Sequence, residues 1–299
     1  MRSCNLGTDG ITTRVPVRST TIGQGRCRRD PLIRRRGLCA GSLTSILADP
    51  TARSGLSFRA MATFVIVHGA WGGGWEWRAV ANVLTSKGHA VFTPTLTGLG
   101  ERSHLRSRSI GLATHATDVA ELIRWEQLHG VLLVGHSYGG MVITVVASMA
   151  PERIRGLVYI DAFIPEPGQS EVDLIDPEWV QSMLIEPARA QGDGWLVPYP
   201  FAEDEDLELP PEAAERYRAS PHPLATFTDP AAVDAAVLTL PSAFVHCTRK
   251  DPGEDAFANS EHRARHRGWR LREIHSAHDV QFEAPEGIAS LLHDMSGDM

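Results

Sequence analysis

The residues best suited to chemistry are Gly135-His136-Ser137-Tyr138-Gly139-Gly140, directly after the apolar run 131–134. A serine hydroxyl is a weak nucleophile at neutral pH, so a reactive serine must stand clear of the backbone, beside a base and amide donors. A G-x-S-x-G turn from a strand into a helix achieves this, and residues 141–150 are apolar enough for that helix. The pattern predicts that Ser137 is a nucleophile. The alternative is that Ser137 only caps the helix.

A nucleophilic serine of this kind is followed along the chain by an acid and then by a histidine base. His278 lies in the loop after the predicted strand 269–274, so we expect it to be the base. Asp251 follows the predicted strand 242–248, at the carboxyl edge where open α/β sheets place their sites. We therefore expect Asp251 to be the acid. The alternative acid is Asp161, which closes an earlier predicted strand.

Two backbone amides should stabilise the oxyanion. One belongs to Tyr138, the residue after the nucleophile, and the other to the loop after the first core strand. That strand covers 63–67 and runs into the glycine-rich loop 68–75, where Ala70 is the expected donor. A phosphate-binding loop is the competing interpretation, but neither Gly-Lys-Ser/Thr nor G-x-G-x-x-G occurs there. Nucleotide binding is therefore not expected.

From about Ala62 onward the chain resembles the α/β-hydrolase fold superfamily, within the branch of plant methylesterases, plant hydroxynitrile lyases and small bacterial esterases. The resemblance implies Ser137 as nucleophile, His278 as base and Asp251 as acid, with Ala70 and Tyr138 as oxyanion donors. The stretches that carry it are Phe64-Val65-Ile66-Val67-His68-Gly69-Ala70-Trp71, Thr93-Pro94-Thr95-Leu96-Thr97-Gly98-Leu99-Gly100, the serine turn, and Cys247-Thr248-Arg249-Lys250-Asp251.

Two positions bear on the choice between ester hydrolysis and cyanohydrin cleavage. The related plant lyases carry threonine where this chain has Gly69, and lysine after the catalytic histidine, where this chain has Asp279. That lysine stabilises cyanide, and an aspartate would disfavour an anionic leaving group. We therefore expect a serine esterase that cleaves a small carboxylic ester through an acyl-enzyme. A carbon–carbon lyase and a slow-turnover ligand-binding protein on the same fold remain the alternatives.

The pattern of elements predicts one α/β domain over residues 61–299, with a mostly parallel sheet flanked by helices. Between Asp161 and Ser242 lie about 80 residues, far more than an ordinary crossover needs. We expect a helical cap at about 164–240, with Asp176-Pro177 and Asp229-Pro230 each starting a short helix. The candidate pocket residues are Trp71, Trp179, Leu184, Trp195 and Phe227.

Residues 1–60 differ from the rest because they contain 11 arginines, three aspartates, and neither lysine nor glutamate. Their net charge is about +8, which leaves about −15 for residues 61–299 within the total of −7. This composition predicts a disordered leader, either a start assigned upstream of Met61 or a transit segment. A nucleic-acid partner is not expected, because the acidic remainder would repel phosphates.

Cysteine use favours a cytoplasmic protein, since Cys247 is the single cysteine beyond the leader. His262 and His266 are four residues apart but lack the glutamate of H-E-x-x-H, so no metal is expected. We also expect no cofactor and no membrane partner, because the chain contains no run of about 18 apolar residues. The partner should be a small ester, and the oligomeric state is left open, with a homodimer among the options.

Overall fold

The computed structural model describes residues 61–201, 209–250 and 255–299. The predicted leader, residues 1–60, and the predicted acid Asp251 lie outside the described residues. None of the described helices is long and apolar enough to cross a membrane.

Strands and helices alternate along the described chain, as the sequence predicts. The strands are β1 (Thr63–Val67), β2 (Ala90–Phe92), β3 (Val131–Ser137), β4 (Ile154–Ala162), β5 (Leu196–Val197), β6 (His222–Pro223), β7 (Ser242–Cys247) and β8 (Arg270–Ile274). The helices are α1 (Arg78–Ser86), α2 (Leu112–Trp125), α3 (Gly139–Met149), α4 (Pro177–Val180), α5 (Glu186–Gln191), α6 (Pro211–Arg218), α7 (Ala225–Thr228), α8 (Ala258–His266), α9 (Val280–Glu283) and α10 (Pro285–Ser296).

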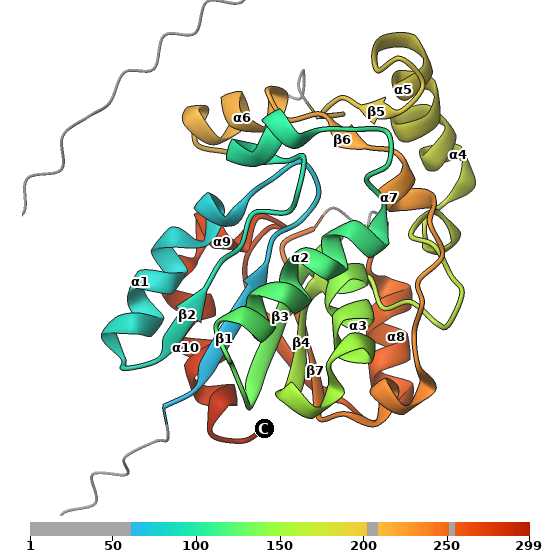
Figure 1. Ribbon diagram of the computed structural model, residues 1–299. Coiled ribbons are helices and arrows are strands. Elements are labelled where there is room, and N and C mark those ends of the chain that lie inside the picture. Colours follow the sequence, from blue (N-terminus) through green and yellow to red (C-terminus); the bar gives the residue numbers. More distant parts are fainter. Residues whose placement is uncertain (1–60, 202–208, 251–254) are drawn as a thin grey trace, which may run out of the picture. The chain divides into compact units, whose positions relative to one another are not determined.

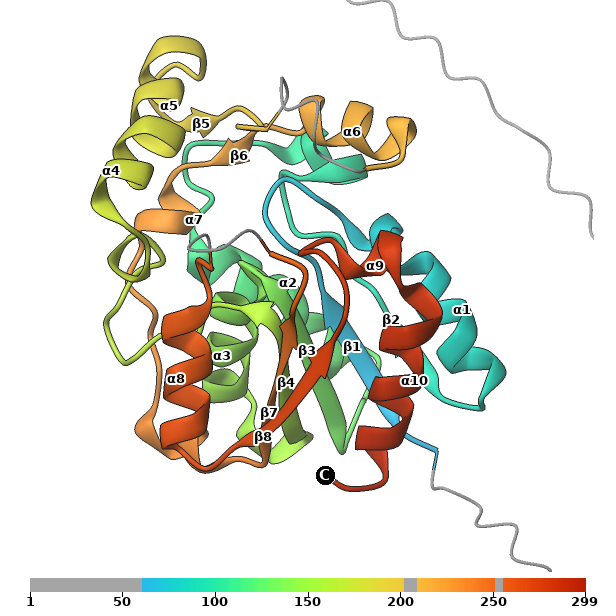
Figure 2. The same cartoon turned by 180° about the vertical axis from the view of Figure 1, so that it is seen from behind.

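Six strands form a parallel sheet in the order β2-β1-β3-β4-β7-β8. Successive residues of a strand point to opposite faces, so the core divides into two layers. On one face, Phe64 and Ile66 pack with the apolar residues of α1 and α10. On the other face, Val65 and Val67 pack with those of α2 and α3. Figures 1 and 2 show the two helical layers on either side of the sheet. The fold class expected from the sequence is confirmed.

The insertion between β4 and β7 lies beyond the carboxyl ends of the strands (Figure 1). It contains α4 to α7, a π-helical turn at Gln181–Ile185 and the antiparallel pair β5–β6. Asp176 starts α4 as expected, because its carboxylate accepts hydrogen bonds from the Glu178 and Trp179 amides.

One expectation for the cap was wrong, and one feature of the cap was not expected. Asp229 ends α7 instead of starting a helix, and its carboxylate accepts a hydrogen bond from the Leu112 amide at 3.2 Å. It therefore caps the amino end of α2, from a position 117 residues later in the chain. The pair β5–β6 was also not expected, because strands of two residues leave no alternating pattern in the sequence.

Candidate active site

Ser137 lies at the carboxyl end of β3, at the sharp turn into α3. Its backbone φ is +53°, a left-handed conformation that is uncommon for residues other than glycine. A Cβ atom added at Gly139 would lie 2.6 Å from the Val67 carbonyl oxygen, and one at Gly140 would lie 2.2 Å from that of Phe163. The turn thus needs glycines at both positions because the neighbouring backbone leaves no room for a side chain. The local structure is that of a nucleophile elbow.

His278, in the loop between β8 and α9, is oriented by Asp161. Its Nδ1 atom lies 2.8 Å from Asp161 Oδ2, so Nδ1 carries a proton and donates a hydrogen bond to the carboxylate. Nε2 is then the nitrogen that can accept a proton from a serine. The His278 side chain is 37% exposed, so a substrate can reach it, whereas the Asp161 side chain is fully buried.

The effect of Asp161 on the pKa of His278 outweighs the effect of removing the imidazole from water. Burial alone would lower the pKa of His278, but the hydrogen bond and charge of Asp161 raise it above its usual value of 6.5. Burial would conversely raise the pKa of Asp161, but His278 and Lys250 together hold that pKa below its usual value. The acid is therefore ionised at neutral pH, as an orienting carboxylate must be.

A bulge in β4 directs Asp161 toward His278. Along the β3–β4 ladder His136 pairs with Ile160, but the next residue, Ser137, pairs with Ala162. Asp161 is the extra residue between these pairs and has a φ of +43°. Bulges of this kind re-aim a side chain that would otherwise follow the strand. The bulge places the acid beside the elbow serine at the same edge of the sheet.

His136 connects the elbow to the loop that carries the base. Its Nε2 donates to the His278 carbonyl oxygen at 2.9 Å, and the two rings lie 4.5 Å apart. Burial and the neighbouring His278 lower the pKa of His136 to about 3, so its ring is neutral. The described residues include no hydrogen bond between Ser137 Oγ and His278. Serine–histidine hydrogen bonds often tighten only when a substrate binds.

The loop after β1 packs directly against the elbow. A Cβ atom at Gly69 would lie 3.2 Å from the Ser137 Cβ, so the following amide, that of Ala70, is close to the nucleophile. His68 holds this loop: its Nδ1 donates to the Gly69 carbonyl at 2.7 Å, and its Nε2 accepts from the Leu96 amide at 3.1 Å. Within the described residues, neither the Ala70 nor the Tyr138 amide donates to a protein acceptor. Both remain candidates for binding an oxyanion.

The cap is anchored on the same loop through Trp71. The Trp71 amide donates to His222 Nδ1 and its indole donates to the Val197 carbonyl, both at 3.0 Å. Trp71 is 8% exposed and has a φ of +59°. The cap strands β5 and β6 thus hold the residue that follows the expected oxyanion donor.

The other candidate pocket residues divide by burial. Leu184 and Phe227 are buried in the core cluster, and Phe227 packs 5.6 Å from the Trp71 ring. Trp179 and Trp195 are partly exposed, and Arg108 lies over the Trp195 ring. Contact with a substrate stays a prediction for all five residues.

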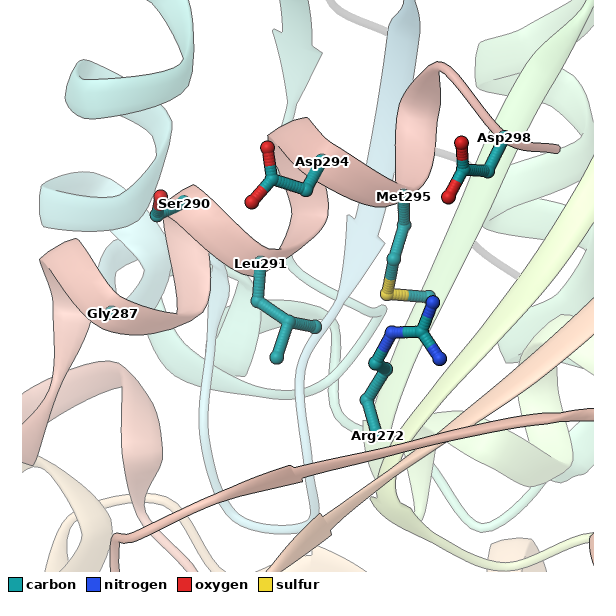
Figure 3. Close-up of a pocket in the computed structure, with 7 residues that line it drawn as sticks. All are labelled: Arg272, Gly287, Ser290, Leu291, Asp294, Met295 and Asp298. Carbon is teal, nitrogen blue, oxygen red and sulfur yellow. The ribbon is translucent and has the colours of Figure 1, made fainter.

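Two pockets occur elsewhere in the described part of the chain. One, of about 280 Å³, lies between β8 and α10 and is lined by Arg272, Asp294 and Asp298 among others (Figure 3). The other, of about 340 Å³, lies between α6, α9 and the start of α1. Ser137, Asp161 and His278 line neither pocket, so neither is the reaction site.

One group of metal-type side chains occurs in the described residues, formed by His246, Asp255 and Glu261. Protein partners already engage it. His246 Nδ1 donates to Glu261 Oε2 at 2.6 Å, and Lys250 donates to Asp255 at the same distance. Arg265 binds the second oxygen of Glu261. These hydrogen bonds account for the cluster without a cation.

The structure brings Ser137 and His278 to one edge, as the sequence predicts, but the carboxylate bound to His278 is Asp161. Asp251 lies outside the described residues, and its role stays a prediction. Sequence reasoning did not identify Lys250, whose ammonium lies 2.7 Å from Asp161 Oδ1. Its place after the penultimate predicted strand was the available signal.

Comparison with known proteins decides the family. The sequence profile of the alpha/beta hydrolase family matches residues 64–291, which include the elbow, Asp161 and His278. The chain belongs to the alpha/beta hydrolase family. Its described strands show the parallel sheet of that family, and the elbow turn occupies the family's usual place between a central strand and a helix.

Members of this family with related sequences include esterases and a lyase. A carbendazim hydrolyzing esterase of Nocardioides sp. (strain SG-4G) is 38% identical over 251 residues, covering 78% of this chain and 98% of that protein. An alpha-hydroxynitrile lyase of Arabidopsis thaliana is 31% identical over 104 residues, covering 34% of this chain and 40% of the lyase.

A related solved structure is an extracellular alpha/beta-hydrolase from a Paenibacillus species, described as sharing structural and functional homology with tobacco salicylic acid binding protein 2. It is 25% identical, covers 78% of this chain and 98% of its own, and has a TM-score of 0.64.

Proposed function

We propose that this member of the alpha/beta hydrolase family is a serine esterase that cleaves a small carboxylic ester through an acyl-enzyme. The observation that carries the proposal is the hydrogen bond between His278 and Asp161 at the sheet edge where the Ser137 elbow lies. It fixes the imidazole tautomer in which Nε2 can act as a general base. The similarity to a carbendazim hydrolyzing esterase along nearly its whole length supports the same class of reaction.

In the first half-reaction, Ser137 Oγ attacks the acyl carbon while His278 Nε2 accepts the hydroxyl proton. The Ala70 and Tyr138 amides stabilise the oxyanion of the tetrahedral intermediate. As this intermediate collapses, the bond to the alcohol oxygen breaks and His278 returns the proton to that oxygen. The alcohol leaves, and the acyl group stays esterified to Ser137.

In the second half-reaction, His278 takes a proton from water, and the resulting nucleophile attacks the acyl-enzyme. Collapse of the second intermediate releases the carboxylic acid and returns the proton to Ser137. Asp161 stays ionised throughout and stabilises the imidazolium that forms twice in each cycle. We assign the acid role to Asp161, with Asp251 as the alternative to be tested by substitution.

The surroundings of His278 favour hydrolysis over the lyase alternative. Asp279, the next residue, is partly buried, and its Oδ1 accepts a hydrogen bond from Gln281 at 3.0 Å. Burial raises the pKa of Asp279. Neither the neutral nor the ionised form of this side chain supplies the positive charge that would stabilise a cyanide leaving group. Asp279 therefore argues against cyanohydrin cleavage, despite the short match to a hydroxynitrile lyase.

We further propose a cytoplasmic location and a small neutral ester as the substrate. The single cysteine of the described residues, Cys247, is buried and free, which agrees with a reducing compartment. The aromatic anchors Trp71 and Phe227 give the cap side of the site an apolar character. A short acyl or aromatic acid group would suit these surroundings.

The test is the hydrolysis of p-nitrophenyl acetate, p-nitrophenyl butyrate and carbendazim by the full-length protein and its Ser137→Ala variant. We expect turnover of at least one ester by the unmutated protein, and a loss of about 10⁴-fold or more in the variant. A folded protein without turnover, which still binds ester analogues after Ser137→Ala, would support the binding-protein alternative. Cleavage of a cyanohydrin in place of esters would support the lyase.

A further inference from the structure

We propose that Lys250 is a positioning residue of the active site, which holds Asp161 in place and tunes the basicity of His278. This inference rests on the proposed function, because it concerns the same acid and base. Lys250 follows β7 and sits between two carboxylates. Its ammonium Nζ lies 2.7 Å from Asp161 Oδ1 and 2.6 Å from Asp255 Oδ1.

Asp161 uses its two oxygens for two different partners. Oδ2 accepts from His278 and Oδ1 accepts from Lys250, so the carboxylate is held as a bridge between them. Two anchors of this kind fix both the position and the rotation of a carboxylate. With Lys250 removed, one oxygen would lose its main donor, although the Cys247 amide lies 3.4 Å from it. The direction in which Asp161 presents Oδ2 to the imidazole would then be less defined.

The charge balance also requires Lys250. Asp161 is fully buried, and a buried carboxylate needs a compensating charge to stay ionised. His278 cannot supply that charge while it is neutral and acting as a base. The Lys250 ammonium, itself only 14% exposed, supplies it throughout the catalytic cycle. The chain has one other lysine, Lys87, among 29 lysines and arginines, so lysine is not its usual cation. A compact ammonium fits between two carboxylates where a planar guanidinium would need more room.

A second connection reaches His278 through an aromatic ring. Lys250 Nζ lies 5.1 Å from the centroid of the Phe257 ring, which stacks on the His278 ring at 4.9 Å with an interplanar angle of 10°. Asp255, the other carboxylate bound to Lys250, accepts a hydrogen bond from the Phe257 amide at 3.0 Å. Lys250 thus contacts both the acid that binds the imidazole edge and the aromatic ring that stacks on the imidazole face.

The described charged and titratable groups around His278 come from four elements. Asp161 of β4 and Asp279 at the start of α9 raise the pKa of His278, whereas Lys250 after β7 lowers it. His136 of β3 is neutral, because burial lowers its pKa to about 3. Without the Lys250 charge, less opposes the upward effect of the two carboxylates on the pKa of His278. The imidazole should then hold its proton to a higher pH.

The experiment measures pH profiles of kcat/KM for the full-length protein and three variants, Lys250→Met, Lys250→Arg and Lys87→Met. Lys250→Met should lose about tenfold or more in kcat/KM at pH 7, mostly through kcat, and its acid limb should move up by about one pH unit. Lys250→Arg keeps the charge but not the compact shape, so its acid limb should stay near that of the unmutated protein, while the larger guanidinium should restore only part of kcat. Lys87 is exposed at the end of α1, so Lys87→Met should behave as the unmutated protein.

The titration of the His278 ring by NMR, assigned with His278→Gln, measures the same effect without reference to turnover. An upward shift of the His278 pKa in Lys250→Met supports the inference. An unchanged acid limb together with an unchanged titration would overturn it, even if activity falls at every pH. A protein without esterase activity, or with esterase activity that Ser137→Ala retains, would instead overturn the proposed function. The titration would still decide the electrostatic role of Lys250.

Discussion

His278 Nδ1 and Asp161 Oδ2 lie 2.8 Å apart, although 117 positions separate the two residues along the chain. The bond joins a loop after the edge strand β8 to a bulge in the inner strand β4. Through it, a residue between the elbow and the cap sets the orientation and basicity of a residue near the C-terminus.

The acid limb of the pH–rate profile should lie above pH 6.5. Catalysis needs neutral His278, and Asp161 raises the pKa of that imidazole above 6.5 in spite of its burial. Activity should therefore fall as pH decreases through the raised pKa. The stability contribution has the opposite sign: it is fully present below the unfolded-state pKa and is lost as pH rises through the folded-state pKa. A plot of kcat/KM against pH checks the limb, and a midpoint well below 6.5 would contradict the expected coupling.

Asp161→Asn should lower kcat by about 10⁴-fold, because an amide can neither stabilise the imidazolium nor fix its tautomer. The matched variant is Asp251→Asn, which we expect to keep activity within a few-fold. Steady-state kinetics on p-nitrophenyl butyrate compares the two, with thermal unfolding as a check on the fold. A larger loss in Asp251→Asn than in Asp161→Asn would reverse the assignment of the acid.

The sequence predicted much of this site because its signals are local. A glycine-flanked serine after an apolar run identifies Ser137, and a histidine in the loop after a predicted strand identifies His278. The acid was harder, since Asp161 and Asp251 both follow predicted strands that end at the same edge of the sheet. Which of two such carboxylates reaches an imidazole depends on a one-residue bulge, and a bulge leaves no mark in hydrophobic periodicity.

The cap was predicted in outline but not in detail. Its length and position follow from the long interval between two strands, and Asp176 starts a helix as its sequence indicates. Asp229 has the same Asp-Pro pattern, yet it caps α2 across the fold, because the first amides of a helix lack intrahelical acceptors and a carboxylate from a distant chain segment can bind them. Such long-range capping depends on tertiary packing.

Gly139→Ala should disrupt the elbow. The added methyl group would lie 2.6 Å from the Val67 carbonyl oxygen and 2.9 Å from that of His68, so backbone must move. We expect a loss of about 1–3 kcal/mol in unfolding free energy and of most activity. Gly287→Ala in α10 is the control, since its Cβ would make ordinary contacts at 3.4 Å or more. It should change stability by less than about 1 kcal/mol. Equal behaviour of the two variants in chemical denaturation would argue against a tightly packed elbow.

His222→Leu should weaken the link between the cap and the oxyanion loop. The Trp71 amide would lose its acceptor in a buried setting, at a cost of about 1–3 kcal/mol. Because Ala70 is the preceding residue, we expect kcat to fall along with stability. His262→Leu, at an exposed position on α8, serves as the control. Thermal unfolding and kcat are measured on both variants, and a full kcat in a destabilised His222→Leu would show that the cap does not position the oxyanion donor.

The central claim is that Ser137 carries the acyl group during turnover. The most direct measurement is rapid mixing of the full-length protein with p-nitrophenyl butyrate, followed by acid quenching and peptide mass spectrometry. We predict a butyryl group on the peptide that contains Ser137, formed no slower than steady-state turnover, and no such adduct in Ser137→Ala. Turnover without acylation of Ser137 would contradict the account, and so would a Ser137→Ala variant that turns over as fast as the unmutated protein.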